Sequence, residues 1–243
     1  MKSYYHGRSQ YKSLSVGELR ARAGRSLNRA ARDGADFEPV VVLGRKISES
    51  WWGQAWCQNL ERYADYANRI GRGKRYVRSG AVVDLKISTG LISGRVQGSR
   101  RTPYKVEIAI KPISAGVYKN ILSRCCLKVQ TLEALIEGNF PEELKELFLD
   151  KEGLFPTPEE ISFDCSCPDW ASMCKHVAAV MYAVAVRLDE NPFWFFQLRG
   201  IDVDKLIGTT LDSKVDQMIK NARKPNPRIL KGADLVGLFG IEK

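Results

Sequence analysis

The chain has 243 residues, of which 44% are apolar and 27% charged, with 38 Lys and Arg against 28 Asp and Glu and a formal net charge of +10. These proportions are typical of a soluble globular protein that buries at least one core. No apolar run approaches the roughly 20 residues of a membrane span, and the first residues, MKSYYHGRSQYKS, lack the apolar segment of a secretory signal. We therefore expect a cytoplasmic protein with no membrane contact.

The positive charge lies in the first half of the chain. Residues 1–120 contain 23 Lys and Arg and 9 Asp and Glu, whereas residues 121–243 contain 15 and 19. This asymmetry indicates a polyanionic partner, nucleic acid before membrane. The alternative is a solvated basic surface that has no partner.

The first predicted helix follows a polar N-terminal arm. Ser15 and Glu18 have the spacing of a capping box, and Gly34 is a suitable stop for a helix that ends near Asp33. Its arginines recur at spacings of 3, 4 and 3, at Arg22, Arg25, Arg29 and Arg32. Like charges on one helix face repel each other, and a phosphate backbone would relieve the repulsion. Solvation, or pairing with the acidic second half of the chain, is the alternative.

Residues 39–43 predict a short strand, and Ser48 begins a helix that runs to about residue 68. Trp52, Trp56 and Leu60 share one face of that helix, a spacing typical of core packing. The following GRGKRYVR at 71–78 predicts a basic loop, and it lacks the spacing of a nucleotide-binding P-loop. Its candidate nucleic-acid contacts are Arg72, Lys74, Arg75 and Arg78.

From residue 81 the apolar period changes to 2. Three alternating segments, at about 81–87, 91–97 and 104–110, are separated by short turns and predict an antiparallel meander with one solvated face. The basic residues expected on that face and its adjoining turn are Lys86, Arg95, Arg100, Arg101, Lys105 and Lys111. A basic face beside a basic loop would form a groove that tracks a nucleic-acid backbone. Alternatively, the lysines protect exposed strands from edge pairing.

Residues 114–149 predict helices, and the proline-containing segment at 154–158 predicts a linker. After the linker, Cys165, Cys167, Cys174 and His176 form a C-x-C-x6-C-x-H array. Alternation along a strand places both cysteines of C-x-C on one face, and the second pair precedes an apolar helical pattern. Three thiolates and one imidazole are a usual ligand set for a structural zinc ion. Disulfides or unrelated buried cysteines are the alternative, although C-x-C is a poor disulfide geometry.

This array resembles the SWIM zinc finger, whose pattern is C-x-C, a variable gap and C-x-H leading into a helix. The flanking DCSCPDWASMCKH, the WWGQAW at 51–56 and the run at 79–104 are similar to bacterial SWIM-finger proteins. Bacterial proteins of this type resemble accessory partners of Snf2-type helicases. The resemblance implies one structural Zn²⁺ and a helicase subunit or adaptor.

The last residues predict a short helical tail. Asp212 is placed to cap a helix that ends near residue 223, and ADLVGLF at 233–239 is an apolar segment. That segment could fold back on the core or dock into a groove of a partner.

Together these patterns predict an α+β protein with N-terminal helices, a three-stranded antiparallel meander, a helical middle, a zinc finger of strand, turn and helix, and a helical tail. We divide it into a basic arm and helix (1–34), an α+β region (35–155), the finger (156–200) and the tail (201–243). Protein ligands fill all four zinc positions, whereas a catalytic zinc keeps one open, and His6 and His176 are the only histidines. We therefore expect no catalytic activity and no small-molecule substrate.

The expected function is binding of DNA or RNA through backbone contacts of the basic N-terminal half. The alternative is a protein–protein interaction module that uses the finger and the apolar tail without touching nucleic acid. Salt dependence separates the two, because phosphate neutralisation makes log K fall linearly with log salt.

Overall fold

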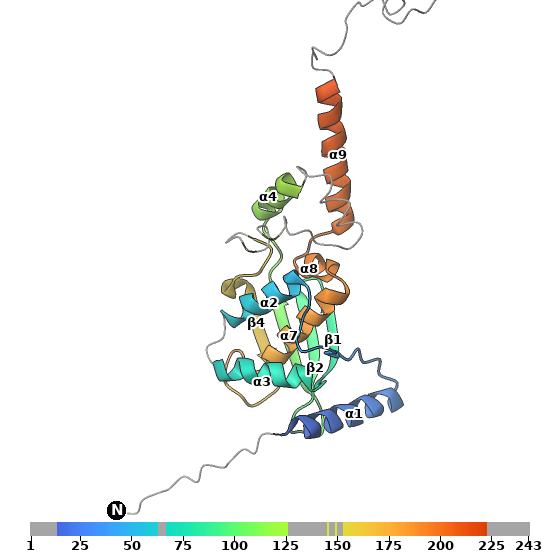
Figure 1. Cartoon of the computed structure of the whole chain (residues 1–243), viewed down its shortest axis with the longest axis vertical. Helices are drawn as coiled ribbons and strands as arrows, with labels where there is room; N and C mark the ends of the chain where they lie inside the picture. The colour runs from blue at the N-terminus through green and yellow to red at the C-terminus, as the bar shows by residue number, and fades with distance from the viewer. Residues whose placement is uncertain (1–13, 63–66, 126–144, 146–148, 150–152, 223–243) are drawn as a thin grey trace, which may run out of the picture.

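The computed structural model describes residues 14–62, 67–125, 145, 149 and 153–222 (Figure 1). Its elements are α1 (Val16–Arg32), α2 (Trp51–Glu61), α3 (Ala67–Arg78), β1 (Val82–Ser88), β2 (Leu91–Val96), β3 (Tyr104–Ile110), α4 (Ala115–Cys125), the 3-10 turn η2 (Pro158–Glu160), β4 (Ile161–Cys165), α7 (Lys175–Glu190), α8 (Phe193–Leu198) and α9 (Val203–Ala222). The predicted α+β class is confirmed. Among the described residues, no helix has the length and apolarity that crossing a membrane requires.

The described strands form one antiparallel sheet in the order β1-β2-β3-β4. The predicted meander is therefore present, but it is extended by a fourth strand. β4 ends at Cys165, the first cysteine of the C-x-C segment, and pairs with β3, so that Cys165 lies opposite Val106. The sheet thus includes the first metal-ligand position at the end of its edge strand β4, and Cys167 follows just after it.

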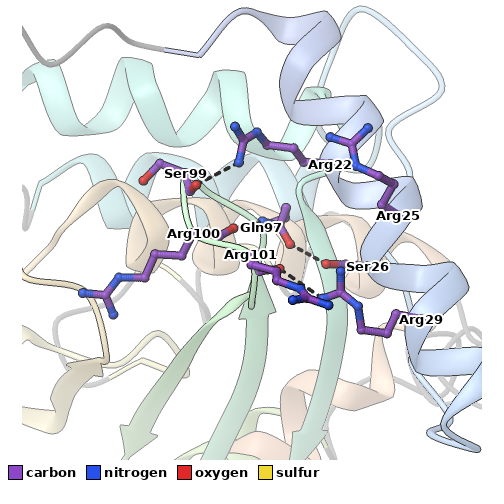
Figure 2. A pocket seen from close by; sticks show the side chains of 8 residues that line it. All are labelled: Arg22, Arg25, Ser26, Arg29, Gln97, Ser99, Arg100 and Arg101. Carbon is purple, nitrogen blue, oxygen red and sulfur yellow. Dashed lines mark hydrogen bonds between the residues drawn. The ribbon is translucent and has the colours of Figure 1, made fainter.

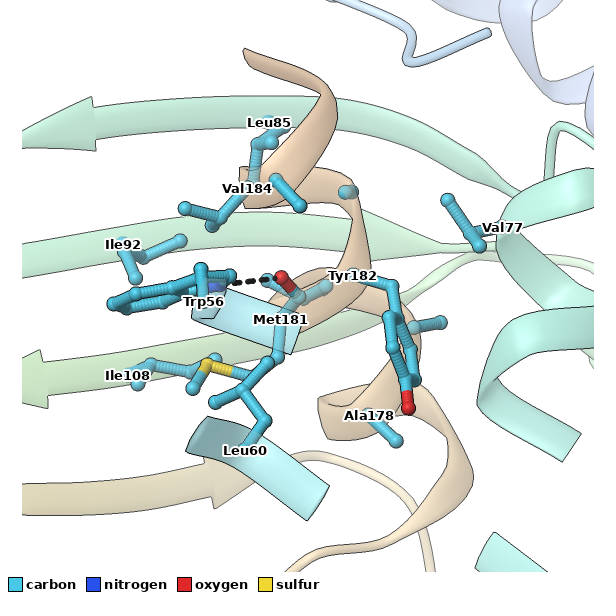
Figure 3. Packing of buried hydrophobic residues seen from close by; sticks show 14 of the residues in the cluster. Trp56, Leu60, Val77, Leu85, Ile92, Ile108, Ala178, Met181, Tyr182 and Val184 are labelled. Atoms are coloured by element: carbon cyan, nitrogen blue, oxygen red, sulfur yellow. Dashed lines mark hydrogen bonds between the residues drawn. The ribbon is translucent and has the colours of Figure 1, made fainter. Parts of the chain in front are cut away.

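Helix α7 occupies the centre of the fold. It lies on one face of the sheet, and α2 and α3 cover its other side (Figures 1 and 3). Every residue from His176 to Val186 is buried. The apolar pattern predicted for this helix is therefore confirmed, and the burial includes all sides of the helix. The Trp56 indole N–H of α2 donates to the Met181 carbonyl at 2.9 Å, inside this packing. A helix covered on both sides needs apolar residues all round.

The start of α2 is fixed by the end of α7. Ser50 is the N-cap and accepts a hydrogen bond from the Gly53 amide. The Asp189 carboxylate accepts from the Glu49 amide at 2.7 Å and from the hydroxyls of Ser48 and Ser50. A carboxylate is favourable here because the amino end of a helix is electropositive.

The basic segment 71–78 is helical, so the predicted loop is wrong. It forms most of α3, and Tyr76 and Val77 are buried. Gly73 faces α7, and a Cβ at this position would come within 2.6 Å of the Ala178 Cβ. The glycine therefore serves a close approach of two helices rather than a turn.

Three local predictions also fail. The helix predicted from Ser48 to about residue 68 is shorter, since α2 has Ser50 as its N-cap and ends at Glu61. Residues 39–43 form no strand, although the chain there runs beside β1, where the Val40 amide donates to the Val82 carbonyl at 3.1 Å. Asp212 lies inside α9, which begins at Val203. Of the helices predicted over 114–149, α4 covers the first part, and most of the remainder lies outside the described residues, as does the apolar segment 233–239.

Candidate metal centre and basic pocket

The four predicted metal ligands come together at the junction of β4 and α7. The ligand atoms of Cys165, Cys167, Cys174 and His176 all lie within 4.8 Å of one another. Cys165 ends β4, Cys167 follows it, and Cys174 is the N-cap of α7, with its Sγ accepting a hydrogen bond from the Val177 amide at 3.5 Å. Cys174 and His176 are buried. This donor set fits one tetrahedral structural zinc ion, as predicted.

The imidazole approaches the cysteines through Nδ1. This atom lies 3.9 Å from Sγ of Cys165 and 3.9 Å from Sγ of Cys174, whereas the other ring nitrogen, Nε2, is buried and has no hydrogen-bond partner among the described residues. Nδ1 is therefore the atom that would bind the metal. Burial lowers the pKa of His176, so the ring is neutral near pH 7, as a ligand must be.

The thiols differ in acidity before metal binds. A hydrogen bond from Cys165, together with His176 and the Val177 amide, lowers the pKa of Cys174 to about 3. The Cys165 pKa is raised because its proton is held between the two sulfurs and because the thiol is desolvated, and burial raises the pKa of Cys167. Thiols that still carry protons must lose them to bind zinc.

Aromatic rings and one ion pair surround the metal centre. Tyr104 of β3 stacks on the His176 ring, with centroids 4.3 Å apart and planes 25° apart. Tyr76 of α3 meets the same ring edge-on at 5.5 Å. Within the turn between the ligand pairs, Asp169 accepts from Arg69 Nη2 at 3.0 Å. The finger is thus packed against both β3 and α3.

Comparison with known proteins supports the metal assignment. Residues 164–185 match the SWIM zinc finger family, and all four ligands lie in this span. The chain is 34% identical over 172 residues to the uncharacterized protein Rv2102 of Mycobacterium tuberculosis, a match that covers 70% of this chain and 62% of that protein. No solved structure matches. The metal-binding segment is therefore a SWIM zinc finger for one zinc ion.

A second concentration of functional side chains lies beside α1. The capping box predicted at Ser15 and Glu18 is present and starts this helix. α1 crosses one end of the sheet, next to the loop between β2 and β3, hereafter the β2–β3 loop (residues 97–103) (Figure 1). Between them is a pocket of about 350 Å³, hereafter the arginine pocket, which is lined by Arg22, Arg25, Ser26, Arg29, Gln97, Ser99, Arg100 and Arg101 (Figure 2).

Hydrogen bonds between helix and loop hold this pocket in shape. Arg22 Nη1 donates to the Ser99 carbonyl at 2.8 Å, and Arg29 Nη1 donates to the Arg101 carbonyl at 3.3 Å. The buried Ser26 hydroxyl donates to the Gln97 side chain. Each arginine bond uses one of five guanidinium donors, so most donors remain for a ligand.

The lining of the arginine pocket contains no carboxylate. In the part of the chain that the structure describes, none of its arginines forms an ion pair with Asp or Glu. Positive charges gathered in a concave site raise the local concentration of anions. The pocket thus has the electrostatics of an anion-binding site.

The other predicted nucleic-acid contacts lie outside this pocket. Arg32 is exposed in the last turn of α1, and Arg72 and Arg78 are exposed on α3. Lys74 lies 2.6 Å from a Glu61 carboxylate oxygen and 5.4 Å from the centre of the Tyr182 ring. Lys74 is therefore already paired within the protein, and Arg75 is half-buried beside it.

The outer face of the sheet carries both signs of charge. Arg95 forms an ion pair with Asp84 at 3.4 Å, and Lys86 lies 3.8 Å from Glu38. Lys105 is next to Arg95 across the strands, and Glu107 lies on the same face of β3. The lysines and arginines that the alternating pattern predicts on this face are therefore interspersed with acidic groups.

Sequence reasoning named the arginines of the pocket but missed the residues that shape it. Ser26 and Gln97 lie 71 positions apart, and Tyr104 lies 72 positions from His176. Neither pair has a local pattern that would predict its contact. The sequence offers one indication of the first contact, because Ser26 is a polar residue on the buried face of α1, where its neighbours are Ala23 and Ala30.

Proposed function

We propose that this protein is a non-catalytic, zinc-stabilised, cytoplasmic subunit that binds the phosphate backbone of DNA or RNA through the arginine pocket. In the same proposal it serves as an accessory subunit or adaptor of a Snf2-type helicase, the role implied by its resemblance to bacterial SWIM-finger proteins. The observation that carries the proposal is the arginine pocket itself, with five arginines and no carboxylate in its lining.

The arrangement favours phosphate over other anions of similar charge. Arginine presents donors in a planar fork that matches two phosphate oxygens at once. The pocket is open to solvent on a helix and a loop, so a continuous backbone can pass over it. Contacts to phosphate fix position without reading sequence. We therefore expect little base specificity.

The metal centre supports a structural role. Its four protein ligands fill the tetrahedral positions of zinc, and catalysis by zinc requires an open position for water or substrate. The finger also joins β4 to the central helix α7. Its zinc would therefore stabilise the scaffold that carries the arginine pocket.

The test is fluorescence anisotropy with labelled single- and double-stranded DNA and RNA. With about four phosphates neutralised, binding should weaken roughly a hundredfold between about 50 and 200 mM salt. The pocket variant is Arg25→Glu with Arg101→Glu, two exposed side chains that make no hydrogen bond within the described residues. It should lose binding while its circular dichroism is unchanged.

A matched control keeps the same change in net charge. Lys119→Glu with Lys220→Glu alters exposed side chains on α4 and α9, which lie at the other end of the molecule from α1 (Figure 1). It should bind nucleic acid nearly as tightly as the parent protein. Equal loss of binding in both variants would mean that net charge, not the pocket, drives binding. Failure of the parent protein to bind any of these nucleic acids at low salt would refute the proposal.

A second candidate function is a protein–protein interaction module. Trp170, in the turn between the metal-ligand pairs, is 82% exposed, and Val215, Met218 and Ile219 are exposed at i, i+3 and i+4 on α9. Exposed apolar side chains at this spacing are typical anchors for a partner groove. Binding to a purified Snf2-type helicase that survives high salt and fails in Trp170→Ala or Met218→Ser would favour this module.

A further inference from the structure

The zinc ligand His176 is connected to the arginine pocket by a continuous series of contacts. The His176 ring stacks on Tyr104, which is only 5% exposed. On this same ring lies the Arg100 guanidinium, 5.2 Å from the ring centroid. Arg100 lines the arginine pocket. The metal centre and the pocket therefore share a single aromatic ring between them.

The backbone of the β2–β3 loop is fitted against the same rings. Gly98 lies so close that a Cβ there would come within 2.6 Å of the Tyr104 ring and 3.2 Å of His176 Nε2. The Gln97 side-chain amide donates to the carbonyls of Gly98 and Arg100, at 3.0 and 2.7 Å. The backbone of the loop that presents Arg100 therefore packs directly against the Tyr104 and His176 rings, with no room for a side chain at position 98.

On the opposite side, α1 holds the loop by the bonds that shape the pocket. Arg22 and Arg29 donate to loop carbonyls, and Ser26 donates to Gln97. The side chains that make these three hydrogen bonds also line the arginine pocket, so they would contact a phosphate bound there or lie beside it. A ligand in the pocket and a metal in the finger thus constrain the same seven-residue loop from two sides.

We infer that zinc binding in the finger and phosphate binding in the arginine pocket are positively coupled through Tyr104 and the β2–β3 loop. The inference rests on the proposed function, of which it describes the regulation. Zinc fixes the plane of the His176 ring, the ring fixes Tyr104, and Tyr104 holds Arg100 and with it the β2–β3 loop that lines the pocket. Coupling between two sites is reciprocal, so nucleic acid must tighten zinc binding by the same factor as zinc tightens nucleic-acid binding.

The first experiment uses the unaltered protein. Zinc affinity is measured by competition with a chromogenic chelator, with and without a saturating amount of the oligonucleotide that binds best. We expect zinc to bind at least about 5-fold more tightly with the oligonucleotide, the lower end of typical coupling. An oligonucleotide that binds the zinc-loaded protein but leaves its zinc affinity unchanged would overturn the inference.

The second experiment requires no nucleic acid. Hydrogen exchange of residues 97–103 is compared in the zinc-loaded protein and in Tyr104→Leu and Tyr104→Phe, with zinc content measured on the same samples. Tyr104→Leu removes the stacked ring but none of the four ligands, so the loop should exchange at least about 5-fold faster while one zinc stays bound. Tyr104→Phe keeps the ring and should restore the slow exchange.

An internal control separates loop release from general unfolding. The turn around Gly90 lies at the other end of β2, where the Gly90 amide donates to the Leu198 carbonyl at 3.0 Å, and its exchange should not change in Tyr104→Leu. Unchanged exchange of residues 97–103 in that variant would overturn the inference. If the loop is released but the zinc-loaded protein binds no nucleic acid, the proposed function fails and the link from finger to loop stands.

Discussion

Gly73 of α3 lies directly against Ala178 of α7, in the most extensive helix–helix contact among the described elements. A Cβ on Gly73 would come within 2.6 Å of the Ala178 Cβ and within 3.0 Å of the Ala178 carbonyl carbon. The two helices are therefore so close at this point that only the hydrogen atom of a glycine fits between them. This contact holds the basic helix α3 against the helix that begins at the metal centre.

Replacing Gly73 by alanine should destabilise the protein. In an open helix position the change would gain about 0.5–1 kcal/mol, but here overpacking against backbone costs roughly 1–3 kcal/mol. We expect a net loss of about 1–2 kcal/mol, measured as a lower midpoint of urea unfolding with an unchanged slope. Adding Ala178→Gly should recover only part of it, because the backbone of α7 remains in the way.

Gly71→Ala is the matched control. Gly71 is in the same helix, and no atom lies within 4 Å of a Cβ built on it. This variant should gain about 0.5–1 kcal/mol. Equal effects at positions 71 and 73 would contradict the close approach of α3 and α7.

The comparison of these glycines shows what the sequence can and cannot predict. Elements with a signal in their own residues were predicted correctly, including the capping box at Ser15, the alternation of β1 to β3, and the C-x-C-x6-C-x-H array. The segment 71–78 was misassigned because two glycines among charged residues are typical of a loop. Only the neighbouring helix makes Gly73 useful, and that helix lies about 100 residues away.

The candidate site divides in the same way. The four metal ligands lie within 12 residues of one another, so spacing alone predicts the site. The arginine pocket joins α1 to a loop more than 70 residues later, and charge counting could name its arginines without showing which ones converge. For Lys74 and Arg95, only the three-dimensional structure shows the carboxylates of Glu61 and Asp84 beside them.

Loss of a metal ligand should remove zinc and loosen the region that the finger organises. We expect Cys167→Ser and His176→Ala to bind less than one zinc per chain and to lose helical signal, because metal binding contributes folding energy. The checks are metal analysis by mass spectrometry and far-ultraviolet circular dichroism. Cys57→Ser is the control, since Cys57 is far from the cluster in sequence and is not one of its ligands; it should retain one zinc.

Zinc affinity should rise with pH. The pKa of Cys165 and of Cys167 is raised in the metal-free protein, whereas that of Cys174 is lowered to about 3. Below the raised pKa values both thiols keep their protons, so binding should release about two protons and affinity should fall as pH falls. Titration calorimetry in buffers of different ionisation enthalpy measures that number. Release of no proton would contradict the predicted thiol state.

The buried Arg199 should be needed for stability. It is 2% exposed and donates through Nη2 to both carboxylate oxygens of Glu160, at 3.1 Å each, and through Nη1 to the Lys111 carbonyl at 2.7 Å. Arg199→Met leaves the carboxylate without its partner, which we expect to cost about 2–4 kcal/mol. Urea unfolding measures this loss.

Two further variants separate the ion pair from simple packing. Adding Glu160→Gln to Arg199→Met removes the stranded charge, so the double variant should be more stable than Arg199→Met alone. Arg199→Lys should not restore stability, because an ammonium group cannot make the paired contact. Additive losses in the double variant would mean that the two side chains do not interact.

Cys57 should react slowly with thiol reagents although a small molecule can reach it. It lines a pocket of about 320 Å³ with Glu61, Lys74 and Tyr182. Burial, and then the charge of Glu61, raise the pKa of the Cys57 thiol to about 12. Since the thiolate is the reactive form, alkylation at pH 8 should be about a thousandfold slower than for an unfolded cysteine.

The pH dependence of alkylation tests whether acidity or access limits Cys57. Peptide mass spectrometry after iodoacetamide treatment should show its rate rising about tenfold per pH unit from pH 8 upward, while the thiolate fraction grows. In urea the rate should match that of the other cysteines. A rate that is slow but independent of pH would mean that the pocket excludes the reagent, and that the raised pKa is not what protects Cys57.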